Sequence, residues 1–430
     1  MRKKVITLMV FAMALFIISC ATQAEQGIVI KEKNGKFELL IDGVPTYING
    51  VGGTNRLDIA AENGANAFRT WGGNVEGIKR QLELAKQYNM YIMQGIGMTQ
   101  DSARYFDETY KERMRAEVKT LAETFKDDPN ILVWAIGNEI DLGKANIPEA
   151  WILVNELAEI IKSIDKRHLV ATVVSHGKKA LDLIGEHAPA LDVIGINSYG
   201  AINGVEKMVN ESKYNGAYFI TEWGPTGHWE MPRTSWRAPI EQTSEEKRIV
   251  YEERYNTSIG GAKACLGSFV FLWGQKQERT PTWYSMFVES RVEGLPLQGE
   301  KTPQVEAMQR VWAKKEVVQT APVVHSFTID GKKATDNVTL AKGKQFTATV
   351  DVTDKQGDKL TYIWEILSEA TVLGSGGSYE PRPSRMGEVI TSDTNSNTFT
   401  ISETGPARVF VYISDNTGFV STANIPVLVE

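Results

Sequence analysis

The stretch Ile131-Leu132-Val133-Trp134-Ala135-Ile136-Gly137-Asn138-Glu139 decides the fold of this 430-residue chain. Its first six residues are apolar and several are β-branched, which is typical of a strand buried on both faces. The run then ends abruptly in an amide and a carboxylate. A buried strand that delivers polar side chains at its carboxyl end is a common way to place chemistry at the mouth of a parallel barrel.

A second run of the same design lies at 217–223, where Glu222 follows a buried apolar stretch. From residue 47 onward, short apolar runs alternate with longer amphipathic segments, such as the expected helix Val75–Tyr88. This pattern predicts βα units and a parallel sheet. Eight such units in about 270 residues match the count and size of a (β/α)8 TIM barrel. An open doubly wound sheet is the alternative, but Val51-Gly52-Gly53-Thr54 is too short for its phosphate loop. The expected strands are Tyr47–Val51, Ala67–Trp71, Tyr91–Ile96, Leu132–Gly137, Val170–Val174, Val193–Ser198, Tyr218–Glu222 and Ser268–Trp273.

The segments on either side of these units have a different pattern. Two alternating runs around Asn34-Gly35 predict a hairpin, so residues 28–315 are expected to form the barrel with an N-terminal β-hairpin. Residues 316–323 are a predicted linker. From 324 to 430 the hydrophobic period becomes two, and short strands with turn signals predict an immunoglobulin-like β-sandwich around Trp364.

The first twenty residues are typical of an export signal. A charged start at Arg2-Lys3-Lys4 precedes an apolar stretch that is too short for a comfortable membrane span. The segment 16–20 resembles a bacterial lipobox, which implies that Cys20 is lipidated and that residues 21–27 are a tether. We therefore expect a cell-envelope lipoprotein of the outer membrane, held to the membrane only by this lipid. A plain secretory signal is the alternative.

Charge and composition exclude several partner classes. Removal of residues 1–19 takes away Arg2, Lys3 and Lys4 and no acids, so the formal charge goes from −6 to −9. An acidic protein is a poor candidate for nucleic acid and suits a neutral substrate. No cluster of histidines and cysteines has metal-ligand spacing, so we expect neither a metal nor a cofactor. We expect a monomer.

Glu139 and Glu222 each end their own buried strand, and such a pair is the minimum equipment for cleaving a glycosidic bond. One carboxylic acid protonates the leaving oxygen, and the other carboxylate attacks the anomeric carbon when the two lie about 5 Å apart. The ends of strands four and seven face each other across a barrel mouth, so this separation is reachable. Asn138 is placed to hydrogen-bond the sugar 2-hydroxyl, a contact that strengthens in the transition state.

The segments 134–139 and 220–224 resemble the strand-end motifs of the retaining TIM-barrel glycoside hydrolases of clan A. The resemblance covers about residues 28–315 and implies that Glu139 is the acid/base and Glu222 the nucleophile. It also implies three supporting roles. Arg69 would touch the nucleophile, Tyr199 would hydrogen-bond it, and Trp273 would be the platform beneath the sugar.

A more specific resemblance rests on the domain order. A single barrel followed by an immunoglobulin-like domain, behind a lipoprotein signal, is similar to glycoside hydrolase family 158. This implies an endo-β-1,3-glucanase that acts on a laminarin-like β-glucan. Strand three here ends in Gly95-Ile96-Gly97-Met98, without the histidine that many clan members carry, which argues against the commonest cellulase-like family.

Aromatic residues and a histidine on the catalytic face are the remaining substrate-binding candidates: Trp71, Trp223, His228 and Trp229. An exo-acting enzyme of the β-galactosidase or β-mannosidase kind, or a transglycosylase, would use the same barrel. A non-catalytic glycan-binding surface lipoprotein is the alternative from another class. Few spare aromatics on the strands of the C-terminal sandwich favour a spacer over a glycan-binding role for it.

Overall fold

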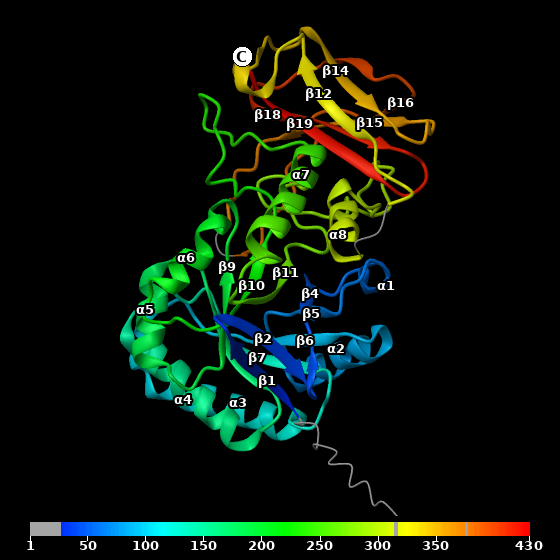
Figure 1. The fold of residues 1–430 in the computed structure, drawn as a ribbon. Coiled ribbons are helices and arrows are strands. Elements are labelled where there is room, and N and C mark those ends of the chain that lie inside the picture. The colour runs from blue at the N-terminus through cyan, green and yellow to red at the C-terminus, as the bar shows by residue number, and fades with distance from the viewer. Residues whose placement is uncertain (1–26, 314–316, 375–376) are drawn as a thin grey trace, which may run out of the picture.

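The structure is a computed structural model that describes residues 27–313, 317–374 and 377–430. Eight parallel strands close into a barrel in the order β10-β11-β4-β5-β6-β7-β8-β9, with helices packed around it (Figure 1). Each strand lies where the sequence predicts one, which confirms the TIM barrel. The strands are β4 (Ile48–Gly52), β5 (Ala67–Arg69), β6 (Tyr91–Ile96), β7 (Ile131–Asn138), β8 (Leu169–Val174), β9 (Val193–Asn197), β10 (Tyr218–Trp223) and β11 (Cys265–Val270).

The helices follow the amphipathic segments of the sequence. The predicted helix 75–88 is present with the same bounds because Asn74 caps its first turn and Asn89 ends it in a left-handed conformation. The helices are α1 (Leu57–Glu62), α2 (Val75–Tyr88), α3 (Glu108–Phe125), α4 (Pro148–Ile164), α5 (Lys178–His187), α6 (Val205–Asn210), α7 (Ser244–Arg254) and α8 (Pro303–Ala313), with the short turns η1 (Ser102–Phe106), η2 (Gly200–Gly204) and η3 (Tyr255–Ile259).

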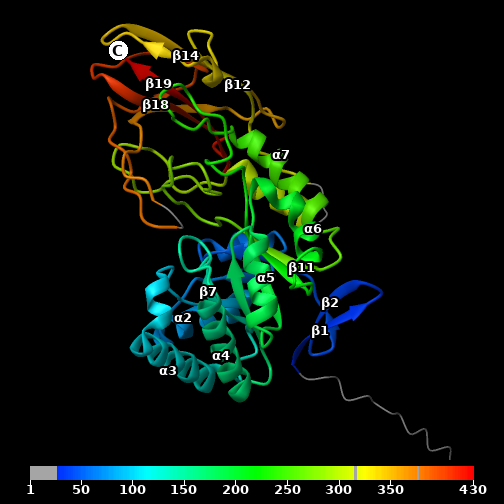
Figure 2. The ribbon, with the colours of Figure 1, turned by 90° about the vertical axis from the view of Figure 1, so that its left-hand side faces the viewer.

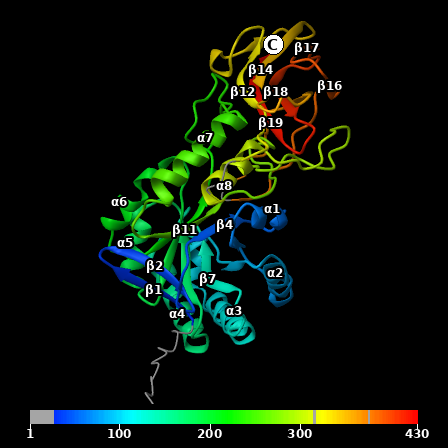
Figure 3. The same ribbon diagram turned by 45° about the vertical axis from the view of Figure 1, so that its right-hand side comes forward.

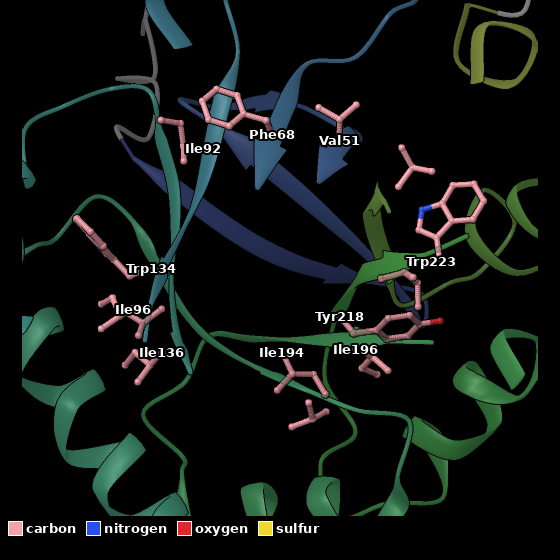
Figure 4. Close-up of a cluster of buried hydrophobic side chains, with 14 of the residues drawn as sticks. Val51, Phe68, Ile92, Ile96, Trp134, Ile136, Ile194, Ile196, Tyr218 and Trp223 are labelled. Atoms are coloured by element: carbon pink, nitrogen blue, oxygen red, sulfur yellow. The ribbon is translucent and has the colours of Figure 1, made fainter. Parts of the chain in front are cut away.

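The main hydrophobic core fills the layer between the barrel strands and the helices. Figure 4 shows some of its members, among them Phe68, Trp134 and Trp223, on the outer side of the strands. Because side chains alternate between the two faces of a strand, the residues next to these point into the barrel. This alternation decides which strand-end residues reach the barrel mouth.

An N-terminal β-hairpin closes the opposite end of the barrel, away from the C-terminal domain (Figure 3). Its strands are β1 (Ile28–Lys33) and β2 (Lys36–Ile41), followed by β3 (Val44–Pro45). Ile28, Leu39 and Ile41 share a buried cluster with apolar residues of the barrel interior. The expected hairpin therefore seals the floor, and the carboxyl ends of the strands remain for a site.

The C-terminal β-domain (residues 323–430) consists of two facing sheets, one of β12-β14-β17 and one of β13-β19-β18-β15-β16. Trp364 is fully buried between them and packs against Phe327 and Phe399, as expected of the core tryptophan. This arrangement confirms the predicted sandwich. The strands are β12 (Val323–Ile329), β13 (Thr339–Leu340), β14 (Gln345–Thr353), β15 (Thr361–Ser368), β16 (Ile390–Ser392), β17 (Ser396–Thr400), β18 (Gly405–Ser414) and β19 (Val420–Val429), with the turn η4 (Ala334–Asp336) between β12 and β13.

Helix α7 lies between the barrel and the β-domain (Figure 2), and α8 packs beside it (Figure 1). A buried network of charged and polar groups joins the two parts there. Lys247 of α7 contacts Glu241 at 2.5 Å, and Asn424 of β19 donates to the other oxygen of Glu241 at 2.7 Å. Arg408 of β18, only 1% exposed, donates to Asn424 and to the carbonyl oxygen of Pro239.

Two segments of interest fall partly or wholly outside the described residues. Residues 1–26 do so entirely, so the signal, Cys20 and nearly all of the tether stay predictions. Residues 314–316 also lie outside the described residues. In the predicted linker, Val317 and Ala321 are buried. Across the part of the chain that the structure describes, no helix combines the length and apolar character needed to cross a membrane.

The buried ion pair at the domain junction predicts a large effect on stability. Lys247→Met would leave the carboxylate of Glu241 buried beside an apolar side chain, and removing one partner of such a pair costs about 3–5 kcal/mol. We expect a clear fall in the midpoint of thermal unfolding, measured by circular dichroism. Lys79→Met is the control, because Lys79 is 54% exposed and surface pairs contribute about 0–1 kcal/mol. Equal shifts for both variants would contradict this account.

Candidate active site

A cavity of about 900 Å³ opens at the carboxyl ends of the barrel strands. Its volume is at the upper end of the range for small-molecule sites, about 300–1,000 Å³. Glu139 and Glu222 both line it. The other lining residues include Trp71, Met98, Asn138, Leu142, Ser175, His176, Asn197, Tyr199, His228, Trp229, Glu230, Phe271, Leu272, Lys276, Glu278, Arg279, Gly374 and Gly377.

Arg69, at the end of β5, lies beneath this cavity and is only 1% exposed. Its Nη1 donates to Oε1 of Glu222 at 3.0 Å and to the carbonyl oxygen of Thr221 at 2.8 Å. Its Nη2 donates to Oδ1 of Asn138 at 2.5 Å. One buried cation therefore ties together the ends of β5, β7 and β10.

Three donors converge on the carboxylate of Glu222. In addition to Arg69, the indole Nε1 of Trp71 donates to Oε1 at 2.8 Å, and the hydroxyl of Tyr199 donates to Oε2 at 3.1 Å. Burial, followed by the charge of Glu222, raises the pKa of Tyr199 well above its ordinary value, so the phenol keeps the proton that it donates. The carboxylate is thereby fixed in one orientation, as a nucleophile requires.

Glu139 is held in a different environment. Burial, followed by the charge of Glu222, raises the pKa of Glu139 to about 7. A carboxylic acid with such a pKa carries its proton near neutral pH and can give it up, which suits a general acid/base.

The backbone at Glu139 is strained. Its φ of +50° lies in the left-handed region, which costs of order 1–3 kcal/mol for a residue with a side chain. Three hydrogen bonds hold it there: its N–H donates to Val173, and its carbonyl oxygen accepts from Gln100 and Leu142. The strain is therefore maintained by the surrounding loops and aims the carboxyl group into the cavity.

Two amides connect the carboxylates. Nδ2 of Asn197 donates to Glu139 at 3.0 Å, and its Oδ1 accepts from Arg69 and from the hydroxyl of Thr221. Oδ1 of Asn138 accepts from both Arg69 and Asn197. Because that oxygen is occupied twice, the NH₂ group of Asn138 is the end left for a substrate hydroxyl.

Trp273 does not lie where the sequence placed it. It is fully buried, donates its Nε1 proton to the carbonyl oxygen of Arg56, and packs against Phe287 and Trp312 of α8. The reason is that β11 ends at Val270, three residues before the predicted end, so Trp273 already belongs to the following loop. Trp273 is therefore not the platform beneath the sugar that the sequence led us to expect.

Trp223 is also displaced from the cavity. It follows Glu222 on β10, so the alternation of the strand turns its side chain outward when Glu222 faces inward. It is fully buried against Tyr251 of α7 and Tyr255. Its role is packing between strand and helices.

Phe271 occupies the cavity wall on the side where Trp273 was expected. Its ring makes edge contacts with Trp71 at 5.8 Å and with Tyr199 at 6.3 Å between centroids. Sequence reasoning missed Phe271. The alternation of side chains along a strand was the available signal, because Phe271 lies two positions after Phe269 and therefore on the same inner face.

His228 and Trp229 line the cavity as predicted. Trp229 is 54% exposed and packs edge-on against Tyr199. His228 is 8% exposed, and its Nε2 lies 3.5 Å from Glu278. Its buried Nδ1 has no hydrogen-bond partner among the described residues.

The loop after β11 and the β-domain contribute residues that sequence reasoning missed. Lys276, Glu278 and Arg279 line the cavity from that loop, and Gly374 and Gly377 line it from the β-domain. No strand-end pattern marks any of these positions, and the two glycines are more than 150 residues further along the chain than Glu222. The β-domain is therefore more than the spacer that the sequence favoured.

Among the described residues, no group of three or more His, Cys, Asp or Glu side chains is arranged to hold a metal ion. The one cysteine in the described chain, Cys265, is buried and free.

The two carboxylates predict a coupled titration. In Glu222→Gln the negative charge that helps raise the pKa of Glu139 is gone, while burial of Glu139 remains. We expect ¹³C NMR of labelled glutamate to give a pKa near 7 for Glu139 in the wild type and a lower value in Glu222→Gln, still above the ordinary 4.5. The same pKa in both proteins would show that Glu222 does not act on Glu139.

Comparison with curated proteins finds distant relatives, and no protein-family model matches the chain. A probable mannan endo-1,4-beta-mannosidase A-2 of Aspergillus terreus is 23% identical over 205 residues, or 45% of this chain and 46% of that protein. Mannan endo-1,4-beta-mannosidase 7 of Oryza sativa subsp. japonica is 26% identical over 159 residues, or 30% of this chain and 40% of that protein. The matches thus span less than half the length of each relative.

Solved structures show the same fold. Beta-glucuronidase 2 of Bacteroides uniformis, covalently bound to cyclophellitol-6-carboxylate aziridine, matches with a TM-score of 0.50 and 13% identity over 94% of this chain and 48% of that chain. A beta-glucuronidase of Faecalibacterium prausnitzii matches with a TM-score of 0.50 and 16% identity over 67% of this chain and 52% of that chain. With the closed barrel, these structural matches support the TIM-barrel fold.

Proposed function

We propose that this protein is a retaining glycoside hydrolase that cleaves a neutral β-glycan by double displacement. Glu222 attacks the anomeric carbon while Glu139 gives its proton to the leaving oxygen. Glu139 then takes a proton from water, which attacks the glycosyl-enzyme and releases Glu222.

The observation that carries this proposal is the unequal environment of two carboxyl groups in one cavity. Glu222 faces three donors, whereas the pKa of buried Glu139 is raised to about 7. Pairs of titratable groups with opposed environments are how enzymes assign a nucleophile and an acid. Asn138, with its amide NH₂ free toward the cavity, supplies a donor for the sugar 2-hydroxyl.

The charges in the cavity support a neutral substrate. Lys276 pairs with Glu278 at 2.6 Å, and Arg279 pairs with Glu380. Glu230 accepts from the backbone N–H groups of residues 200 and 227. The cavity cations are thus already matched by carboxylates, so a uronic acid would have to displace an existing partner.

The linkage is a finer proposal. The resemblance to family 158 favours β-1,3-glucan and endo action, whereas the curated relatives are named as 1,4-β-mannan enzymes. We propose β-1,3-glucan as the substrate and an endo mode. An exo-acting β-glycosidase is the second candidate, and the contribution of the β-domain to the cavity wall favours it, because an exo enzyme needs a cleft closed at one end.

A digestion of soluble polysaccharides tests the substrate. We expect a ladder of oligosaccharides from β-1,3-glucan, followed over time by chromatography, and little product from β-1,4-glucan, mixed-linkage glucan or β-mannan. Release of monosaccharide alone would instead support the exo mode. Activity on mannan only would overturn the β-1,3 assignment but leave the mechanism.

Two variants test the mechanism on whichever polymer is cleaved. Glu222→Gln should abolish hydrolysis, and Glu139→Ala should lower it by about 10²–10⁴-fold, with partial recovery on an activated aryl glycoside when azide replaces water. Glu403→Gln is the matched control, because Glu403 is an exposed residue of the β-domain. Glycan binding by the wild type without any product would favour the non-catalytic lipoprotein.

We also propose that the protein is anchored to the cell envelope through lipidated Cys20. Labelling of cells with radioactive palmitate should mark the wild type and not Cys20→Ser, because the other cysteine, Cys265, is buried. Equal labelling of both would exclude this anchor.

A further inference from the structure

The β-domain reaches the catalytic cavity through the segment that follows β15. Gly374 and Gly377 of this segment line the cavity together with Glu139 and Glu222. A domain that served only as a spacer would not be expected to contribute to the cavity of the other domain. The contact therefore raises the question of what fixes this segment in place and what it does there.

Glu380 is the residue that joins this segment to the barrel. Its side chain is fully buried, and its carboxylate contacts the Arg279 guanidinium and accepts from the backbone N–H of Arg279 at 2.7 Å. It also accepts from the N–H of Gly374 at 2.8 Å. One carboxylate of the β-domain thus holds both a barrel loop and a cavity-lining glycine.

The barrel loop is held in a conformation that depends on this contact. Arg279 has a φ of +62°, a left-handed conformation that is uncommon for residues with a side chain. Because Glu380 binds both its backbone and its guanidinium, it stabilises that conformation. The charge-assisted contact of Nη1 with one oxygen of Glu380 also helps to fix the direction of the arginine.

A second set of ion pairs fixes the segment from its other end. Arg382 donates to Glu289 of the barrel at 2.9 Å and to Glu365 of β15 at 2.6 Å. Glu289 therefore lies at this domain contact. The segment around Glu380 is therefore attached to both domains.

From Arg279 the cavity wall continues toward the half-exposed tryptophan. Glu278 precedes Arg279 in the chain, and its carboxylate lies 3.5 Å from the Nε2 of His228. His228 packs against Trp229 at 4.9 Å between ring centroids. We call these residues, Trp229, His228, Glu278, Arg279 and Gly374, the shared wall.

The shared wall has the chemistry of a sugar-binding surface. Trp229 exposes 54% of its surface, which offers a flat apolar face to a pyranose ring. His228, which packs edge-on against Trp229, also lines the cavity. Glu278 and Arg279 also line the cavity, and a charged group that is already paired can still bond a neutral hydroxyl.

We propose that the shared wall is a subsite for a sugar unit beyond the one that is cleaved, and that Glu380 of the β-domain positions it through Arg279. This inference rests on the proposed glycosidase function. Glu380 itself is a positioning residue, because its carboxylate is buried behind the wall and contacts the loop rather than the cavity.

The test compares long and short substrates in Glu380→Gln. The probes are laminarihexaose and mannohexaose, each with the 2,4-dinitrophenyl β-glycoside of its own monosaccharide. The monoglycoside fills only the site beside Glu139 and Glu222, whereas the hexasaccharide also reaches the shared wall. We expect kcat/KM for the cleaved hexasaccharide to fall about tenfold, mainly through KM, as for the loss of one charge-assisted hydrogen bond. The monoglycoside should change less than twofold.

A double variant separates positioning from other effects. If Glu380 acts through Arg279, adding Glu380→Gln to Arg279→Gln should cause no further loss on the hexasaccharide, whereas independent effects would multiply. Glu403→Gln should behave as the wild type. Equal losses on both substrate lengths, multiplied losses in the double variant, or no loss on the hexasaccharide would each overturn the inference. A wild type that cleaves none of the probes would overturn the proposed function itself, and this inference with it.

Discussion

The buried guanidinium of Arg69 is the constraint on which the catalytic end of this barrel depends. A cation that is 1% exposed has lost its water, and such a loss costs several kcal/mol unless partners replace it. The partners are the carboxylate of Glu222, the amide oxygens of Asn138 and Asn197, and the carbonyl oxygen of Thr221. They come from three other strands. The site and the closure of the barrel rim therefore rest on the same cation, and neither can be altered without the other.

The same arrangement explains why two identical side chains can take different roles. The carboxylate of Glu222 accepts hydrogen bonds from the cation Arg69 and from two neutral donors, Trp71 and Tyr199. Glu139 receives a single neutral amide from Asn197 and faces the charge on Glu222 across the cavity. The left-handed backbone conformation of Glu139 adds to the difference, and the residue lines the cavity. The chemical identity of the residues is the same, and the difference lies in what the neighbouring strand ends supply.

The features that the sequence could predict are those that follow from local periodicity. The eight strands, the helix at 75–88 and the sandwich all come from hydrophobic patterns of period two or 3.6. Glu139 and Glu222 stand at the end of such patterns, and the structure brings both into one cavity. Trp273 and Trp223 were misplaced because strand ends and strand faces must be known to within one residue, which composition alone does not give. Arg279 and Gly374 carry no local signal, since their position depends on how two domains pack.

The contacts that join the two domains also hold in place the part of the cavity wall that the β-domain supplies. Lys247, Glu241 and Arg408 form a buried polar network between the domains, and Glu380 and Arg382 form separate ion pairs nearer the cavity. To swing the β-domain away, these ion pairs and hydrogen bonds from several parts of both domains would all have to break together. The wall that the β-domain supplies is therefore a fixed surface. A site whose far wall is fixed can select for chain length by shape, because a longer glycan either matches that surface or is excluded by it.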